Sequence, residues 1–504
     1  MKIRSMLGVM LLLALIGNAL AGCRPSHAEA IPASRLLRTA TPPSETEAHN
    51  AAPENTNPQP TRTAQPRPTR QPPTQITRSY VVQYGDTLTG IAAYLGVSVE
   101  ELMQANGLTN ADQIKIGQEL QLPMSTPVVT PGEILFPNSE LVYGPGFAGF
   151  DVHAATAHYP GYFNTYTEMT VDGEVLTAPE IIEQVALQYS VGPRILLALL
   201  EAQSGWLTNP DPPPEAQLYP MGFVRDGWDG LAAQAMWAAD ALNAGFYGWL
   251  YDTLWVFRLE DGSYAQFASS LNAGTAGVQR ALASSPDYAA FEQRLGSVVT
   301  MYEQLWGDPF AYSVEPLLPP VGERLELALP WAKGETWYFT GGPHGGWGNG
   351  SGWAALDFAT DEQNLGCYVS KRWVTAATTG RVVHSDDGMV LQELDDDNFA
   401  GTGWVLLYMH MASEGRVGAG TRLETGDPIG HPSCEGGHSN ASHLHFARRY
   451  NGVWIAADAD ADWPLILDGW VAENGARAYD GQLRKQSLVK TAEEDWLPVN
   501  AIQH

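Results

Sequence analysis

The feature that most constrains the fold is a pair of histidines that alternates with large apolar residues, in the run His443-Leu444-His445-Phe446. In a β-strand, side chains two residues apart lie on the same face. Both imidazoles therefore point to one side, while Leu444 and Phe446 point to the core. The pattern predicts a strand that buries one face and presents two histidines on the other.

The sequence around this run is typical of a β domain. From Leu325 onward, Gly, Trp and β-branched residues are frequent, and short strand-like runs recur. The runs are residues 337–339, 374–376, 380–383, 404–408 and 443–446. We therefore expect an all-β C-terminal domain.

Residue types that bind metals also lie upstream of the two histidines. His344 lies in the Gly-rich turn 341–345, and Asp357 follows an apolar pair in the run 354–358. A carboxylate in such an apolar segment needs a partner, and a metal ion is a good one. Two imidazoles, one carboxylate and an open fourth position form the ligand set of catalytic zinc. The sequence therefore predicts a zinc site.

These pieces resemble the lysostaphin/LytM-type zinc endopeptidases of bacterial cell walls. The matching elements occur in the order of that family: His344 with Asp357, then 377–383, 407–410, 426–430 and 442–446. Most members hold the first His and the Asp closer together, whereas here Asp357 follows His344 by thirteen residues. The β-lytic branch of the family has a longer, Gly-rich spacer, and Asn349-Gly350-Ser351-Gly352 fits it.

The resemblance implies a role for each of these residues. His344, Asp357 and His445 would hold one Zn²⁺ per chain, and His443 and His410 fall on the family's two non-ligand histidines. His443 lies on the same strand face as a ligand, so we expect it to take the proton of the attacking water. His410 would hydrogen-bond the oxyanion of the tetrahedral intermediate. Which of the two histidines acts as the base stays open.

Residues 79–124 predict a small module of two strands and two helices. Ser98 is expected to cap the second helix, with Glu101 three residues on as a capping box. The module resembles LysM at the runs 85–88, 105–108 and 116–118. The resemblance implies binding of N-acetylglucosamine-containing glycan, either peptidoglycan or chitin. The alternative is a small α/β domain without a ligand.

Residues 178–310 show helical periodicity, with apolar stripes at 181–189 and 195–200. The run 194–207 resembles the catalytic helix of lytic transglycosylases and goose-type lysozymes. That family needs a Glu as general acid where this chain has Gln203, and an amide cannot supply the proton. Glu201 lies about 200° around the helix axis from Gln203, so it cannot substitute. We expect an inactive lysozyme-like domain, and the alternative is an unrelated helical domain.

The N-terminus predicts export. Lys2 and Arg4 precede a short apolar run, which ends in Leu20-Ala21-Gly22-Cys23. This ending resembles a bacterial lipobox, which implies that Cys23 is lipidated and becomes the new N-terminus; the alternative is a plain signal peptide. An exported chain meets an oxidising environment, so Cys367 and Cys434 are expected to form a disulfide. Two buried free thiols are the alternative.

The expected fold class is a multidomain chain with a small α/β LysM module (βααβ), a mostly α lysozyme-like middle domain and an all-β C-terminal zinc peptidase domain. The predicted segments are a lipoprotein signal peptide (1–22), the lipidated Cys23 with a disordered Pro/Thr-rich tether (23–78), LysM (79–124), a connector (125–177), the helical domain (178–310), the zinc metalloendopeptidase domain (322–480) and a tail (481–504).

Charge argues against one class of function. The chain has 28 basic and 56 acidic residues, a net charge of −28, which disfavours non-specific nucleic-acid binding. We expect an exported endopeptidase that cleaves stem or cross-bridge peptides of peptidoglycan. The lipid at Cys23 would anchor it to the outer face of the cell membrane or of another envelope membrane. The alternative is a non-catalytic peptidoglycan-binding adaptor or activator of other wall hydrolases. A third alternative, handling of chitin or biofilm glycan, is disfavoured by the peptidase domain.

Overall fold

The computed structural model describes residues 79–82, 87–95, 97–115, 117–121, 127–170, 173–459 and 461–504. The predicted signal peptide, the lipidated Cys23 and the tether lie outside the described residues, so they stay predictions. In the described part of the chain, no helix is both long enough and apolar enough to cross a membrane.

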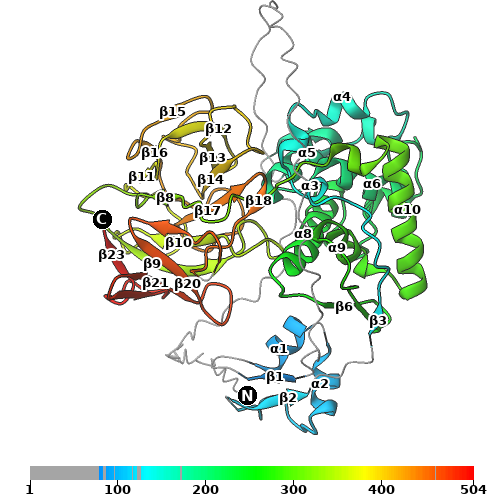
Figure 1. Ribbon diagram of the computed structural model, residues 1–504, viewed down its shortest axis with the longest axis horizontal. Helices are drawn as coiled ribbons and strands as arrows, with labels where there is room; N and C mark the ends of the chain where they lie inside the picture. The colour runs from blue at the N-terminus through cyan, green and yellow to red at the C-terminus, as the bar shows by residue number, and fades with distance from the viewer. Residues whose placement is uncertain are drawn as a thin grey trace, which may run out of the picture. The chain divides into compact units, whose positions relative to one another are not determined.

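The module predicted at residues 79–124 has two strands and two helices in the predicted order (Figure 1). They are β1 (Ser79–Val81), α1 (Leu88–Leu95), α2 (Val99–Ala105) and β2 (Glu119–Gln121). β1 pairs antiparallel with β2, and Leu88, Leu102 and Leu120 lie in the core of the module. The predicted capping box is present, because the Ser98 hydroxyl accepts the Glu101 N–H and the Glu101 carboxylate accepts the Ser98 N–H.

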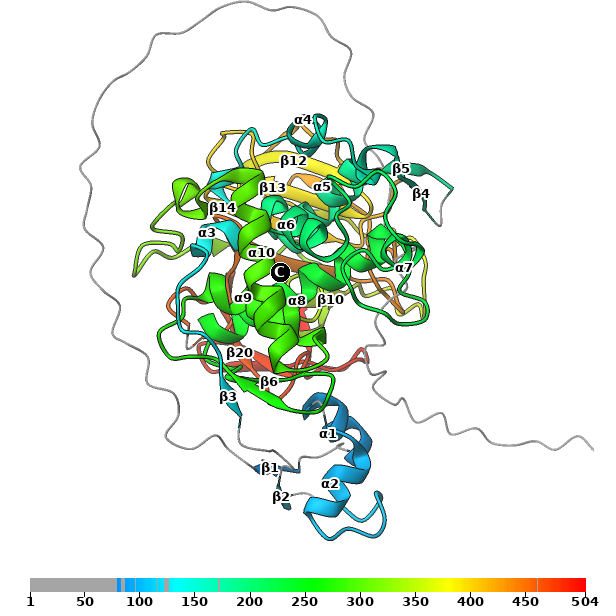
Figure 2. The same ribbon diagram turned by 90° about the vertical axis from the view of Figure 1, so that its right-hand side faces the viewer.

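The middle region is built on five longer helices, and Figures 1 and 2 show α8 beside α9 and α6 beside α10. They are α5 (Ala178–Tyr189), α6 (Pro193–Ser204), α8 (Leu231–Leu250), α9 (Ala273–Ala281) and α10 (Tyr288–Trp306). Local sequence sets their ends: Thr177 and Glu180 form a capping box at α5, and Gly205 ends α6 in the left-handed region at φ 66°. α8 is the central helix, because buried side chains cover most of its circumference.

Shorter elements complete the middle region, and a buried ion pair joins some of them to the helices. They are β3 (Val128–Val129), α3 (Asn138–Leu141), η2 (Pro145–Phe147), α4 (Val152–Thr156), η3 (Tyr162–Thr165), β4 (Thr167–Met169), β5 (Val175–Thr177), α7 (Pro214–Leu218), β6 (Val256–Arg258), β7 (Tyr264–Gln266), η4 (Leu282–Ser284) and η5 (Pro309–Tyr312). Glu140 of α3 accepts two hydrogen bonds from Arg194 of α6, at 3.0 and 2.6 Å, and one from the Tyr302 hydroxyl of α10, at 2.6 Å. The segment before α5 is therefore tied to the helical core.

α6 carries the two residues on which the expectation of lost lysozyme-like activity rests. Gln203 lines a small recess together with Met221 and Trp237. Glu201 is buried, and it accepts hydrogen bonds from the Leu207 N–H at 2.8 Å and from the Thr208 hydroxyl. Glu201 therefore closes the turn after α6, while Gln203 faces the recess.

The C-terminal domain is mostly β, as the sequence predicts, and its main sheet is antiparallel with the order β15-β12-β13-β14-β17-β10-β9-β23; β18 pairs with β17. Its nine strands are β9 (Thr336–His344), β10 (Ala355–Ala359), β12 (Gly380–Asp386), β13 (Met389–Glu393), β14 (Trp404–Met409), β15 (Arg422–Leu423), β17 (Leu444–Tyr450), β18 (Val453–Trp454) and β23 (Ala501–Gln503). A second sheet has the order β22-β21-β20-β19-β8, with β8 (Glu326–Leu327), β19 (Ile466–Leu467), β20 (Trp470–Asn474), β21 (Gly481–Lys485) and β22 (Leu488–Thr491). β11 (Val374–Thr375) pairs with β16 (Pro428–Gly430).

The prediction of a tail at residues 481–504 is wrong. β21 and β22 belong to the second sheet, and β23 pairs with β9 of the main sheet. Ile502 of β23 is fully buried, and the Asn500 side chain donates a hydrogen bond to the Phe339 carbonyl at 3.2 Å. A three-residue strand that buries one side chain produces no periodic pattern in the sequence, so its pairing could not be recognised there.

The main sheet is buried on both faces. On β14, Leu406 and Tyr408 pack in the core inside the C-terminal domain. The alternate residues Val405, Leu407 and Met409 pack in the core that also contains the apolar side chains of α5 and α8. The middle region therefore covers one face of the sheet, which explains why β14 has no polar alternate positions.

Candidate metal centre

Three neighbouring strands bring His344, Asp357 and His445 together. β10 lies between β9 and β17, and Asp357 of β10 is directly opposite His445 of β17. His344 is the last residue of β9 and is paired with Ala355. One donor atom of each of the three residues lies within 4.8 Å of the other two. Sheet pairing thus unites residues that are far apart in the chain.

Hydrogen bonds to backbone carbonyls orient both imidazoles. His344 Nδ1 lies 2.8 Å from the carbonyl oxygen of Gly342, and His445 Nε2 lies 3.1 Å from that of Gly346. A carbonyl oxygen only accepts, so each of these nitrogens carries the proton of the neutral imidazole. The other two nitrogens, His344 Nε2 and His445 Nδ1, therefore direct lone pairs toward each other and toward Asp357.

The spacing of these three donor atoms fits a tetrahedral metal site. His344 Nε2 lies 3.0 Å from His445 Nδ1, and Asp357 Oδ1 lies 3.3 Å from the former and 3.2 Å from the latter. With zinc–ligand bonds of about 2.0–2.1 Å, two ligands of a tetrahedral site are about 3.3–3.4 Å apart. Two lone pairs and a carboxylate oxygen at this distance repel one another unless a cation lies between them. The donor set therefore fits Zn²⁺.

The centre is buried and its carboxylate is ionised. His344, Asp357 and His445 expose only 2%, 7% and 8% of their surface. Burial raises the pKa of Asp357, but His344 and His443 beside it outweigh burial and hold this pKa well below its usual range. Burial lowers the pKa of His445. An anionic carboxylate and a neutral imidazole are the protonation states that a metal ion requires of its ligands.

His443 immediately precedes β17 and lies beside the three candidate ligands. Its Nδ1 lies 2.8 Å from the Ala441 carbonyl oxygen, so Nδ1 carries a proton, and its Nε2 lies 3.5 Å from Asp357 Oδ1. Burial lowers the pKa of His443, but the facing Asp357 carboxylate outweighs burial and raises this pKa above its ordinary value. His443 is therefore able to take a proton at Nε2 and to keep it.

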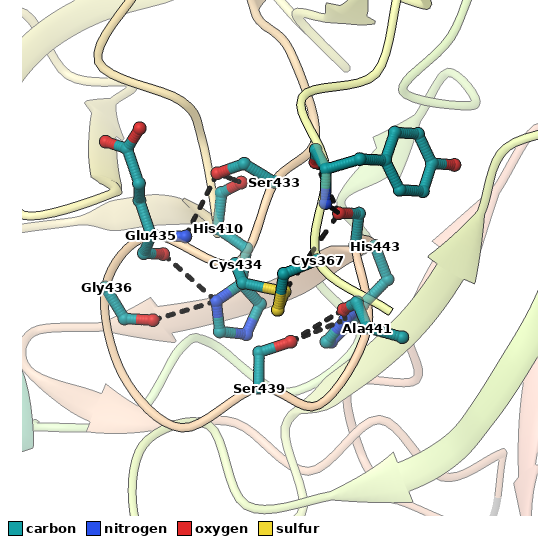
Figure 3. Close-up of a disulfide and its surroundings, with 11 residues drawn as sticks. Cys367, His410, Ser433, Cys434, Glu435, Gly436, Ser439, Ala441 and His443 are labelled. Atoms are coloured by element: carbon teal, nitrogen blue, oxygen red, sulfur yellow. Dashed lines mark hydrogen bonds between the residues drawn. A yellow bond between two sulfur atoms is a disulfide. The ribbon is translucent and has the colours of Figure 1, made fainter. Parts of the chain in front are cut away.

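His410 follows β14 and has a left-handed backbone, with φ 67°. Ser433 secures this turn, because its N–H and its hydroxyl donate to the His410 carbonyl at 2.7 and 2.9 Å. The His410 ring is held through Nδ1, which donates to the carbonyl oxygens of Glu435 at 3.1 Å and Gly436 at 2.9 Å (Figure 3). The opposite ring nitrogen, Nε2, is left without a proton in the neutral form.

The pKa values of the two non-ligand histidines shift in opposite directions. Their ring centroids are 4.5 Å apart. Burial, reinforced by the neighbouring His443 and His445, lowers the pKa of His410 well below its usual range, whereas Asp357 raises the pKa of His443. The surroundings of the two rings therefore shift their pKa values in opposite directions.

The predicted disulfide between Cys367 and Cys434 is confirmed, with the Cα atoms 5.5 Å apart, and Figure 3 shows it in the neighbourhood of His410 and His443. Ser442 reinforces the link: its N–H donates to the Gly366 carbonyl, and its hydroxyl accepts the Tyr368 N–H at 2.7 Å. The disulfide and these bonds join the turn beneath His410 to the segment that leads into β17.

Sequence analysis missed Tyr479, which lies in the loop between β20 and β21. Its ring stacks on the His344 ring, with centroids 4.1 Å apart and an interplanar angle of 22°. The Tyr479 carbonyl accepts the Gly342 N–H at 2.7 Å, and Gly342 also holds the His344 ring. Tyr479 belongs to no recognisable motif, so no pattern in the sequence could have identified it.

Three families match this chain. Residues 80–123 match the LysM domain, residues 134–319 match the N-terminal domain of LasA, and residues 357–457 match peptidase family M23. The chain therefore carries a LysM domain, a LasA N-terminal domain and an M23 peptidase domain. The M23 match begins at Asp357, so His344 lies outside it. The lysozyme-like interpretation of the middle region stays a prediction.

Individual proteins are similar to parts of the chain. Protease LasA of Pseudomonas aeruginosa is 27% identical over 327 residues, which cover 61% of this chain and 73% of LasA. N-acetylmuramoyl-L-alanine amidase XlyB of Bacillus subtilis is 50% identical over 46 residues, 9% of this chain and 14% of that protein. Among solved structures, the deep-sea M23 metalloprotease pseudoalterin is 23% identical with a TM-score of 0.28, and the match covers 35% of this chain and 98% of pseudoalterin. The catalytic domain of lysostaphin from Staphylococcus simulans is 24% identical with a TM-score of 0.17, over 23% of this chain and 81% of that domain.

Proposed function

We propose that this chain, which joins a LysM domain to an M23 peptidase domain, is an exported zinc endopeptidase that hydrolyses peptide bonds of peptidoglycan. The observation that carries the proposal is the convergence of two imidazole lone pairs and an ionised carboxylate at tetrahedral ligand spacing. His344, Asp357 and His445 would hold one Zn²⁺ per chain. The match to peptidase family M23 supports the reaction class.

Zinc held by these three residues would supply positive charge, which would acidify the attacking water and polarise a peptide carbonyl. The proton transfers belong to His410 and His443, which are both held through Nδ1 and therefore react at Nε2. His410 is neutral and has a lone pair at Nε2, so it is suited to accept the proton of the attacking water. His443 Nε2 lies beside the centre, 3.5 Å from Asp357 Oδ1, so in its protonated form it is suited to donate a hydrogen bond to the developing oxyanion or a proton to the leaving nitrogen. The sequence leaves the identity of the base open, although it places His443 to take the proton and His410 to bond the oxyanion; in the proposed mechanism these two roles are exchanged.

The substrate proposal combines the two domains. The LysM match supports binding of N-acetylglucosamine-containing glycan, and the peptidase match supports cleavage of a peptide. Peptidoglycan contains both, so stem or cross-bridge peptides are the proposed substrates. Glycan binding by LysM would raise the local concentration of peptide around the peptidase domain. We also propose that a lipid at Cys23 anchors the chain to an envelope membrane.

Metal content and cleavage of purified peptidoglycan test this function. The wild-type chain is expected to hold one zinc per chain and to release new amino termini, with products identified by mass spectrometry. His445→Ala is expected to lose both properties, because it removes one of the three donors. His438→Ala is the matched control, since His438 is exposed on the loop that precedes β17. A wild-type chain that binds peptidoglycan but holds no zinc and cleaves nothing would contradict the enzyme proposal and favour the adaptor.

A further inference from the structure

The segment between His344 and Asp357 packs directly on the middle region. Residues 345–352, here called the spacer loop, have glycine at five of eight positions. The Gly350 N–H donates to Asp240 Oδ1 of α8 at 2.8 Å, and the Asn349 N–H also donates to the Asp240 carboxylate. Burial raises the pKa of Asp240, and the two backbone donors oppose this rise because they stabilise the carboxylate.

The glycines of the spacer loop allow this close approach. A Cβ atom at Gly350 would lie 2.0 Å from the Asp240 carbonyl oxygen and 2.7 Å from the Ala244 nitrogen. A Cβ atom at Gly348, which has φ 67°, would lie 2.5 Å from Asp240 Oδ1. Neither position tolerates a side chain without separating the loop from α8. Contact with the helix therefore explains the glycines at these two positions.

The spacer loop also touches a candidate metal ligand. The carbonyl of Gly346 accepts the hydrogen bond of His445 Nε2 at 3.1 Å, and this bond directs His445 Nδ1 toward the centre. Within the loop, the Gly346 N–H donates to the Gly352 carbonyl at 3.1 Å, and the Trp347 N–H donates to the Ser351 hydroxyl at 3.0 Å. These bonds make the loop a closed unit, so its position at Asp240 sets the position of the Gly346 carbonyl.

A second contact of the spacer loop is with Trp454 of β18. Gly346 packs against the Trp454 ring, where a Cβ atom would lie 2.4 Å from the ring. The middle region holds Trp454 in turn: its N–H donates to the Tyr247 hydroxyl at 2.9 Å, and its ring Nε1–H donates to the Tyr189 carbonyl at 3.2 Å. The loop therefore lies between α8 and a tryptophan that α5 and α8 secure.

From these contacts we infer that Asp240 is a positioning residue for the metal centre: it fixes the spacer loop, and the loop fixes the orientation of His445. The inference rests on the proposed function, because it treats His445 as a zinc ligand. The middle region would then help to orient a metal ligand, in addition to covering one face of the main sheet.

Two measurements on the full chain test this inference. Amide hydrogen exchange in the metal-free protein reports the spacer loop, and competition with a chromophoric chelator gives the dissociation constant of Zn²⁺. For Asp240→Ala we expect the amides of Asn349 and Gly350 to exchange at least about tenfold faster, because both lose their acceptor. We expect the zinc dissociation constant to rise about tenfold, the lower end of the range for groups that orient a ligand. Asp240→Asn keeps one acceptor oxygen, so its values should lie between those of wild type and Asp240→Ala.

Gln234→Ala is the matched control. Gln234 is a buried polar residue of the same helix, and it bonds the backbone of Phe223 and Trp228, away from the spacer loop. This variant should weaken the middle region without changing the zinc dissociation constant. Unchanged zinc binding in Asp240→Ala, or equal loss of zinc binding in Gln234→Ala, would overturn the positioning role. Absence of zinc from the wild-type chain would instead refute the proposed function and this inference with it.

Discussion

Replacement of Ile502 by Ala tests whether the last residues of the chain are part of the peptidase sheet. Ile502 is fully buried and lies opposite Trp337 in the β23–β9 ladder. The substitution removes three carbon atoms from the core, about 2.4 kcal/mol at about 0.8 kcal/mol for each. A cavity term adds to this value, and buried Ile→Ala changes cost about 2–5 kcal/mol. Because β23 is an edge strand that can partly relax, we expect a loss near 3 kcal/mol.

Native-state hydrogen exchange of the β9 amides is the appropriate assay, because it measures local opening and does not require the whole multidomain chain to unfold in one two-state step. A loss of 3 kcal/mol corresponds to exchange about 150-fold faster, since each 1.4 kcal/mol is about tenfold. Val499→Ala is the control, because Val499 lies in the same segment but exposes 42% of its surface. The reasoning fails if Ile502→Ala accelerates exchange in β9 no more than Val499→Ala does.

Two further predictions concern histidines. His410→Gln should reduce the rate of peptide hydrolysis about 10²–10⁴-fold, because glutamine cannot accept a proton. His443→Gln should retain more activity, because its amide can still donate a hydrogen bond. Equal losses of activity in steady-state assays would contradict the assigned roles. Burial, with Arg449 and Arg416 nearby, lowers the pKa of His384 to about 4. In the unfolded chain the pKa of a histidine is about 6.5, so the unfolded state binds this proton at a higher pH than the folded state does. The contribution of His384 to stability should therefore be complete above pH 6.5 and decline by up to about 3 kcal/mol as the pH falls to 4. Urea denaturation at several pH values checks this, and His384→Phe should flatten the profile.

The middle region has two structural relations to the peptidase domain. Its helices α5 and α8 bury one face of the main sheet, including Val405 and Leu407. The same α8 supplies Asp240 to the spacer loop. A substitution in the middle region can therefore affect the peptidase domain in two ways: by exposing the main sheet or by displacing the spacer loop. Measuring zinc binding distinguishes the two, because we expect only displacement of the spacer loop to change it.

The sequence alone was sufficient where the information is local. The alternation in His443-Leu444-His445-Phe446 identified a strand with both imidazoles on one face, because the period of two is a property of the strand itself. The Ser98–Glu101 capping box was equally readable, because a cap involves residues within one helical turn.

Only the tertiary structure decided which groups meet. The pairing of β10 with β9 and β17 brings His344 to His445, and backbone carbonyls of Gly342 and Gly346 then direct their lone pairs to one point. The edge strand β23 reaches the same sheet from beyond the predicted end of the domain, and Tyr479 reaches His344 from a loop that carries no motif. The physical reason is common to these cases: strand order and the partner of a given carbonyl are set by contacts between distant segments, and no local pattern of residue types records them.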